Sequence, residues 1–150
     1  MYRYLLLFVL LTGCTRIGVF EKNVAIKDQA WGSAVRPSVS FVITDTASPY
    51  NIYLVLRHTD AYRYNNIWLN ISRSGPDTTY RQQVDIKLAT NDKGWLGTGM
   101  DDIFEHRVLL INDVLFKKPG NYTFTLQQIM REDPLQHVLN AGIRVERVKT

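Results

Sequence analysis

The stretch Ser38-Val39-Ser40-Phe41-Val42-Ile43 alternates between two faces with a period of two residues. In a β-strand, Val39, Phe41 and Ile43 would share one face, because successive side chains point to opposite sides of the sheet. Residues 45–49 (DTASP) follow at once, and such a composition is typical of a turn. The stretch therefore predicts a half-buried strand of an antiparallel sheet.

The same alternation recurs along the chain, with turn sequences between the repeats. It is found in residues 52–57, 67–72, 84–88, 122–127 and 143–146, with a further apolar-rich strand candidate at 105–111. Short strands and few convincing helices predict an all-β fold, specifically an antiparallel, jelly-roll-like β-sandwich. The predicted core residues share the apolar faces of these strands: Phe41, Leu54, Leu56, Leu69, Ile86, Phe124 and Leu126. One stretch, residues 129–139, favours a helical turn, which Pro134 would keep short.

The domain organisation is simple, because the chain shows neither an internal repeat nor a linker. Residues 37–150 are predicted to form one β-sandwich domain. Residues 14–36 are mixed and aperiodic, so we expect an irregular lead-in whose Phe20 and Trp31 pack onto that domain.

The N-terminus has the pattern of a signal peptide. A short basic head precedes an apolar run that starts at Leu5 and ends in small residues and Cys14, which is about half the ~20 residues that a membrane-spanning helix needs. Residues 11–14 (LTGC) then look like the lipobox of a bacterial lipoprotein. We expect residues 1–13 to be removed and the Cys14 thiol to be lipidated, which would anchor the protein in a bilayer. An ordinary thiol behind a non-lipidated signal peptide, or a buried segment of a cytosolic fold, are the alternatives.

Charge and cysteine content limit the classes of partner. The 18 Lys and Arg residues and 14 Asp and Glu residues give a net charge of +4, but the basic residues are scattered singly or in pairs such as Lys117-Lys118. Without a basic cluster that contains aromatic residues, we expect no nucleic-acid partner. Cys14 is the only cysteine, so no disulfide can form within the chain and stability must come from the core.

Several residues have the chemistry of a catalytic or metal site, although none has a diagnostic spacing. His58 with Asp60, and Glu105 with His106, could ligate a metal from two strands. A histidine that hydrogen-bonds a neighbouring carboxylate at the surface is the simpler interpretation, so no metal site is predicted. Asp101 and Asp102 could act as paired acid and base only in a loop, because neighbouring strand residues face opposite ways. We predict no catalytic residues and no cofactor.

Aromatic, Arg, His and carboxylate side chains are concentrated in two stretches that we expect to be loops. Tyr, Trp and Arg are the residues that most often anchor protein interfaces. We therefore predict a protein-binding surface formed by Arg57, His58, Tyr62, Tyr64, Trp68, Trp95, Asp101 and Asp102. The same aromatic side chains could instead form a platform on which sugars stack, as in a glycan-binding or small-ligand-binding β-sandwich.

An ordered set of segments along the chain carries a family resemblance: Cys14, residues 19–23 (VFEKN), Trp31, residues 57–68 (RHTDAYRYNNIW), 95–105 (WLGTGMDDIFE), 127–135 (QQIMREDPL) and 142–146 (GIRVE). This set resembles the GldH family of gliding motility lipoproteins from Bacteroidetes. The resemblance implies a non-enzymatic lipoprotein of the cell envelope. Its partners would be other envelope proteins of the gliding machinery, which is tied to type IX secretion. No acidic run follows Cys14, a run that often marks surface-displayed lipoproteins in this group, so a periplasm-facing attachment to the inner or outer membrane is favoured.

Two threonines lie in sequences similar to the O-glycosylation acceptor motif of Bacteroidetes, Asp45-Thr46-Ala47 and Asp77-Thr78-Thr79. Both lie in predicted turns, where a transferase would have access. Simple turn chemistry, in which the aspartate accepts a hydrogen bond from the backbone two residues on, is the interpretation we favour.

Overall fold

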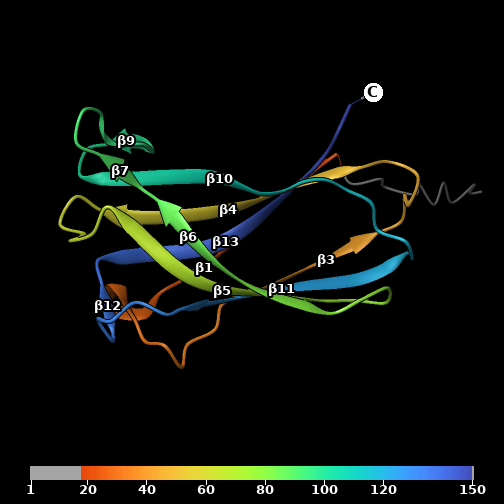
Figure 1. Cartoon of the computed structure of the whole chain (residues 1–150), viewed down its shortest axis with the longest axis horizontal. Helices are drawn as coiled ribbons and strands as arrows, with labels where there is room; N and C mark the ends of the chain where they lie inside the picture. Colours follow the sequence, from red (N-terminus) through yellow and green to blue (C-terminus); the bar gives the residue numbers. More distant parts are fainter. Residues whose placement is uncertain (1–17, 150) are drawn as a thin grey trace, which may run out of the picture.

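A computed structural model describes residues 18–149 of the chain, and these residues fold almost entirely into strands (Figure 1). The signal peptide and the lipidated Cys14 that the sequence predicts lie outside the described residues. The elements in chain order are β1 (Val19–Ala25), the 3-10 turn η1 (Lys27–Gln29), β2 (Ala30–Trp31), β3 (Ser38–Ile43), β4 (Tyr50–Thr59), β5 (Asn66–Ser74), β6 (Tyr80–Lys87), β7 (Ala89–Thr90), β8 (Gly94–Trp95), β9 (Thr98–Met100), β10 (Ile103–Val114), β11 (Gly120–Gln128), β12 (Leu135–Gln136) and β13 (Val138–Arg147).

The long strands form two antiparallel sheets that lie face to face (Figure 1). The first sheet has the order β1-β13-β4-β10-β9, and the second has the order β3-β11-β5-β6. The predicted all-β class and the β-sandwich architecture are confirmed. Because the chain crosses between the sheets from β3 to β4 and again from β4 to β5, neighbouring strands in the sequence supply opposite layers of one core.

The core lies between the two inner faces, where the alternation of the sequence places its apolar side chains. The seven predicted core residues, from Phe41 to Leu126, are all buried, with exposed fractions of 7% or less. Aromatic rings fill the middle of this layer: the Phe41 ring lies 6.0 Å from that of Phe124, and Phe116 lies 4.5 Å from Tyr122, between ring centroids. Close packing of such large side chains supplies most of the hydrophobic stabilisation of a domain without disulfides.

The predicted irregular lead-in contains a strand, which corrects the sequence interpretation. Residues Val19–Ala25 form β1 and pair along their whole length with β13. None of the residues of β1 is fully buried, so the strand lacks the strict alternation of a strand such as β3. The sequence pattern therefore did not reveal it. Phe20 and Trp31 do pack onto the domain, as expected: Phe20 contacts Phe41 at 5.8 Å, and Trp31 is fully buried.

The helical turn considered for residues 129–139 is not formed. Bends and the short strand β12 occupy this stretch, and β12 pairs with β2 through Leu135 and Trp31. The Gln128 side chain holds the start of the segment, because its amide donates to the Trp31 carbonyl at 3.0 Å and its oxygen accepts from the Met130 amide at 2.8 Å.

The two aspartates before the candidate threonines differ in their surroundings. Asp45 accepts hydrogen bonds from the backbone amides of Ala47 and Ser48, which is the turn chemistry that the sequence favours. Asp77 does not: its carboxylate is almost fully buried, pairs with Arg73 at 3.3 Å and accepts from the Lys117 amide. The aspartate of the second motif therefore joins strand β5 to the turn before β11.

Candidate functional site

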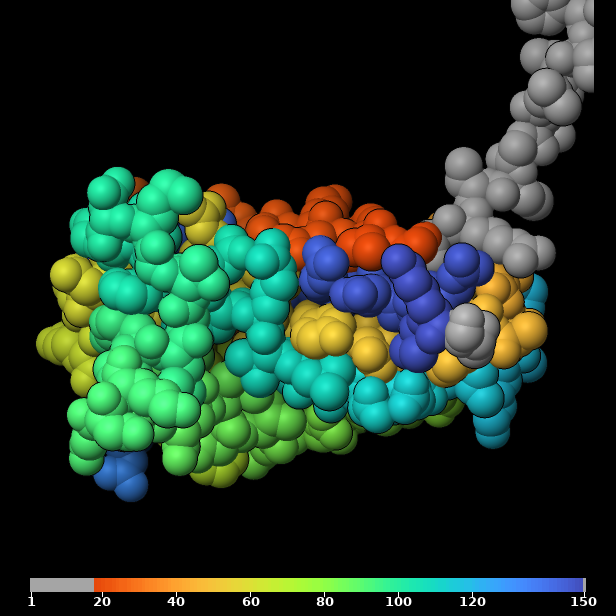
Figure 2. All heavy atoms as spheres, turned by 90° about the horizontal axis from the view of Figure 1, so that it is seen from above, coloured from red at the N-terminus to blue at the C-terminus, as the bar shows by residue number. Residues whose placement is uncertain are grey.

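The two stretches predicted to bind a partner meet at one end of the sandwich. The end of β4 and the loop after it lie beside residues 94–105, which we call the β8–β10 corner (Figure 1). Figure 2 shows the green and teal atoms of this corner gathered at one end of the molecule. The stretches are only partly loops, because Arg57 belongs to β4, Trp68 to β5 and Glu105 to β10.

An aromatic cluster fixes the corner from inside. The Trp95 ring lies 4.5 Å from that of His58, 5.8 Å from Phe104 and 6.2 Å from Tyr62, between ring centroids. Tyr62 is buried, and its hydroxyl donates to the Asn66 carbonyl at 2.9 Å. Burial raises the pKa of this hydroxyl well above its usual value, so Tyr62 stays neutral. These contacts hold the loop 60–65 and the corner together as one unit.

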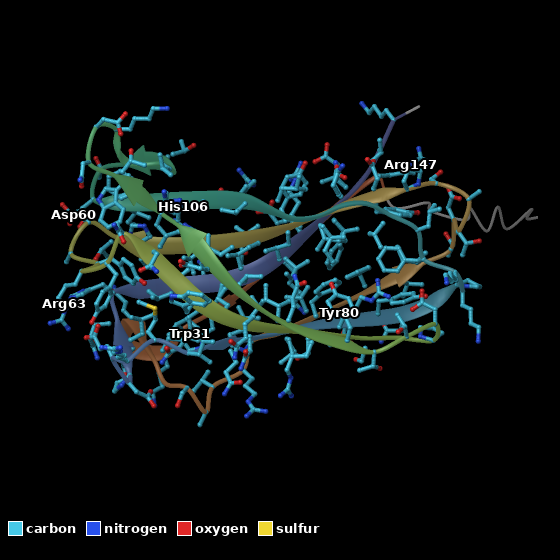
Figure 3. The ribbon with its side chains drawn as sticks, in the orientation of Figure 1. Trp31, Asp60, Arg63, Tyr80, His106 and Arg147 are labelled. Atoms are coloured by element: carbon cyan, nitrogen blue, oxygen red, sulfur yellow. The ribbon has the colours of Figure 1, made fainter. Side chains whose placement is uncertain are left out.

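The centre of the cluster is a pair of buried histidines, not the surface histidine–carboxylate pairs that the sequence suggested. His58 is fully buried, His106 is 3% exposed, and their Nε2 atoms are 2.9 Å apart. The Nδ1 atom of His58 lies 2.7 Å from the Thr59 carbonyl, which can only accept. His58 Nδ1 therefore carries a proton, and His58 Nε2 accepts a hydrogen bond from His106 Nε2. Figure 3 shows His106 between the two layers.

Both imidazoles are held in the neutral form. Burial lowers the pKa of His58, and burial together with the facing His58 lowers the pKa of His106 to about 4. Within residues 18–149, no group of three or more His, Cys, Asp or Glu side chains converges as metal ligands would. The two histidines and their aromatic neighbours thus pack the interior of the corner. The prediction that His58 and Tyr62 lie at the surface is wrong, because both side chains are buried in the core.

The remaining predicted residues of the corner line a hollow of about 270 Å³ on its outer side. Arg57, Asp101 and Asp102 form part of its wall, and both aspartates are exposed in the turn between β9 and β10. Met100 lies beside them and is 78% exposed. The hollow therefore combines apolar surface with charges of both signs.

The arginines of the hollow are held by carboxylates across the outer face of the first sheet. Glu105 pairs with Arg57 at 3.7 Å and with Arg107 at 3.0 Å. Arg107 also makes two contacts with the Glu21 carboxylate, at 3.1 and 3.2 Å, and Arg144 reaches the same carboxylate at 3.1 Å. Hydrogen bonds from Arg107 are the main reason that the pKa of Glu21 lies below its usual value. This row of charges fixes the Arg107 side chain at the rim of the hollow.

Next to the hollow, strand β10 has an open edge. Strand β9 pairs only with Ile103–Glu105, so among the described residues no strand covers the rest of β10 on that side. A second hollow of about 450 Å³ follows this edge from Glu105 to Leu109 and is closed by Leu96 and Lys87. Leu96 and Leu109 are 45% and 47% exposed. Leu96, Leu109 and Met100 were not among the residues predicted to bind a partner. An apolar residue in a glycine-rich loop, or on the edge of a sheet, is a sequence feature that could have indicated them.

Tyr64 and Trp68 lie away from the corner hollow, so the structure divides the predicted surface. They line a separate hollow of about 470 Å³ on the outer face of the second sheet, together with Gln83 of β6 and residues 129–131. Trp68 is 41% exposed. Figure 3 places Arg63 and Asp60 at the same end of the sandwich.

No helix able to cross a membrane occurs among the residues that the structure describes.

Comparison with known proteins places the chain in a family. The sequence profile of the GldH lipoproteins matches residues 18–145, which include nearly the whole described sandwich. The "Gliding motility lipoprotein GldH" of Flavobacterium johnsoniae is 27% identical over 150 residues, which cover 95% of this chain and 92% of that protein. The "Gliding motility lipoprotein GldH homolog" of Christiangramia forsetii is 22% identical over 152 residues, which cover 96% and 93% of the two chains. The chain therefore belongs to the GldH lipoprotein family.

Proposed function

We propose that this protein is a non-enzymatic envelope lipoprotein, held in the membrane by lipid on Cys14, that docks through its β8–β10 corner onto other proteins of the gliding machinery. The names of the two relatives, which cover more than nine-tenths of the chain, support the gliding role. The lipobox at residues 11–14 supports the anchor. The link to type IX secretion follows from the same family resemblance.

The exposure of Met100 is the observation that carries the docking proposal. A thioether side chain that is 78% exposed, with Leu96 and Leu109 about half exposed nearby, is unfavourable in water unless a partner covers it. Met and Arg are enriched at protein interfaces, and the hollow beside Met100 presents Arg57 and Arg107. The open edge of β10 offers a partner backbone hydrogen bonds along the same surface.

The chemistry of the hollow supports binding rather than catalysis. Among the described residues that line it there is no histidine, serine or cysteine, and its arginines are already paired with Glu105. The two histidines nearby are buried behind the corner and hydrogen-bonded to each other. A nucleophile with an adjacent base, which acyl transfer and many hydrolyses need, is not assembled there.

The proposal is tested by replacing Met100 in the full chain and measuring motility. A gliding flavobacterium that lacks its own family member would be complemented with the chain carrying Met100→Asp, which places a charge in the centre of the proposed interface. Complementation should fail while the amount of membrane-bound protein stays normal. Leu115→Asp is the matched control, because Leu115 is 55% exposed and follows β10 at the end of that strand away from the corner. Full motility with Met100→Asp would contradict the proposal.

A further inference from the structure

The hollow at Trp68, on the outer face of the second sheet, has the composition of a sugar subsite. Trp68 projects from the start of β5 onto the outer face of the second sheet and keeps 41% of its surface exposed. Tyr64 lies in the same hollow, with Ile129 and Met130 on one side. An exposed indole beside a second aromatic ring offers the flat, electron-rich surface on which the C–H faces of pyranose rings stack.

Two polar side chains of this hollow are available for a ligand. Gln83 is exposed on β6 and Arg131 is exposed after β11, and within residues 18–149 neither makes a side-chain hydrogen bond or ion pair. The other polar groups are engaged, since Asn66 donates to Asp85 at 2.7 Å and Arg63 pairs with Glu132. A free amide and a free guanidinium beside a stacking platform can donate several hydrogen bonds to hydroxyl and carbonyl oxygens.

On the side of Trp68 away from β6, the sheet surface is polar but uncharged, and we call it the neutral lane. Along β5, β11 and β3, the outward positions carry only hydroxyl, amide and small apolar side chains: Asn70, Ser72, Ser74, Asn121, Thr123, Thr125, Gln127, Ser38, Ser40 and Val42. The charged outward side chains of this sheet, Arg81, Asp85 and Lys87, are on β6 and border the lane on its other side. From Trp68 to Ser74 this lane extends six residues, or roughly 20 Å at the rise of a strand. It is long enough for several sugar rings, and its lack of charge suits an uncharged polyol better than an acidic or basic peptide.

We propose that the Trp68 hollow and the neutral lane bind an uncharged oligosaccharide chain, with one sugar ring stacked on Trp68 and hydrogen-bonded by Gln83 and Arg131. Ile129 and Met130 would receive an apolar substituent such as the methyl group of an N-acetyl amide. The site lies on the sheet opposite to the one that carries the β10 edge. A sugar chain and a protein partner can therefore be bound at the same time.

The test uses the full lipidated chain in detergent, titrated with cellotetraose and with chitotetraose. Both sugars are uncharged β-1,4-linked chains, and only chitotetraose carries N-acetyl groups, so the two arms separate ring stacking from recognition of the amide. We expect saturable binding of at least one sugar, with a blue shift of the tryptophan emission as Trp68 is covered. Preference for chitotetraose would assign the pocket at Ile129 and Met130 to the acetyl group.

Three variants connect the binding to Trp68. Trp68→Ala should weaken binding by about tenfold or more, because the stacked contact with the sugar ring is lost. Trp68→Phe should keep most of the affinity. Tyr53→Ala removes a half-buried aromatic from the outer face of the first sheet and should bind like the wild type.

Absence of saturable binding of either sugar at millimolar concentration would overturn the inference, as would binding that Trp68→Ala leaves unchanged. These outcomes do not depend on docking at the corner, because the Met100→Asp chain should bind the sugar normally even where it fails to support motility.

Discussion

Within residues 18–149, His58 and His106 make a side-chain-to-side-chain hydrogen bond only with each other, inside an aromatic cluster that excludes water. Their pKa values are lower in the folded chain than the ordinary value of 6.5. The unfolded chain therefore binds more protons below pH 6.5, and the free energy of unfolding must fall as pH falls from about 6.5 towards 4. Because the pKa of His106 is about 4, the free energy of unfolding should fall by on the order of 2–3 kcal/mol over this pH interval.

Urea unfolding of residues 18–150 at pH 7.0, 6.0 and 5.0 checks this prediction. The double replacement of His58→Leu and His106→Leu removes both titrating groups while leaving no buried acceptor unpaired, so its stability should change much less over the same interval. Measurements stop at pH 5 because the lowered pKa of Glu21 adds a pH dependence of its own in more acidic solution. Equal pH dependence of the two proteins would show that the pair is not neutral and buried as described.

Part of this site was foreseeable from single residues. His58 has the same parity along its strand as Leu54 and Leu56, both predicted to be buried. Extending that alternation by one step would have placed His58 in the core, although the sequence analysis assigned it to a binding surface. Its contact with His106 was not foreseeable, because it depends on the register that sets Leu56 opposite His106. A register between strands about 50 residues apart in sequence is fixed by the whole sheet, not by local pattern.

At the scale of the elements, the contact between β1 and β13 depends on one glycine. A Cβ atom at Gly142 would lie 2.1 Å from the Lys22 carbonyl oxygen and 2.7 Å from the Asn23 Cα, and backbone atoms cannot yield without moving the strand. Gly142→Ala should therefore detach β1 and lower the free energy of unfolding by about 1–3 kcal/mol. Hydrogen exchange should show lost protection confined to β1 and its pairing side of β13. Gly18→Ala, where a Cβ meets nothing within 4 Å, should match the wild type.

The strands show what periodicity can and cannot predict. Those with one face in the core and one in water, such as β3 and β11, were located from alternation because burial imposes the period of two. Strand β1 was missed because none of its residues is fully buried, unlike the edge strand β3, so pairing with β13 holds it in place without imposing a period of two on its sequence. The corner hollow was missed for a similar reason: its wall is assembled from β4, β9 and β10 by tertiary packing.

For the whole molecule, the proposed anchor determines where the sandwich can act. If Cys14 is lipidated, two or three acyl chains at roughly 0.8 kcal/mol per buried methylene make attachment effectively permanent. Mass spectrometry of membrane-extracted protein should then find an acylated N-terminal Cys14 and no residues 1–13. Cys14→Ala should leave a precursor that is not processed, or a form that is released from the membrane. Recovery of an intact Met1 from the membrane fraction would contradict the anchor.

Docking through the β8–β10 corner is the central claim, and site-specific photocrosslinking in living cells tests it most directly. A benzophenone amino acid would replace Met100 in one strain and Val42 in another, both exposed in the free chain and on different sheets. Position 100 should crosslink to one defined envelope protein, and position 42 should not. Absence of any crosslinked product from position 100, or the same crosslinked products from both positions, would contradict docking through the corner.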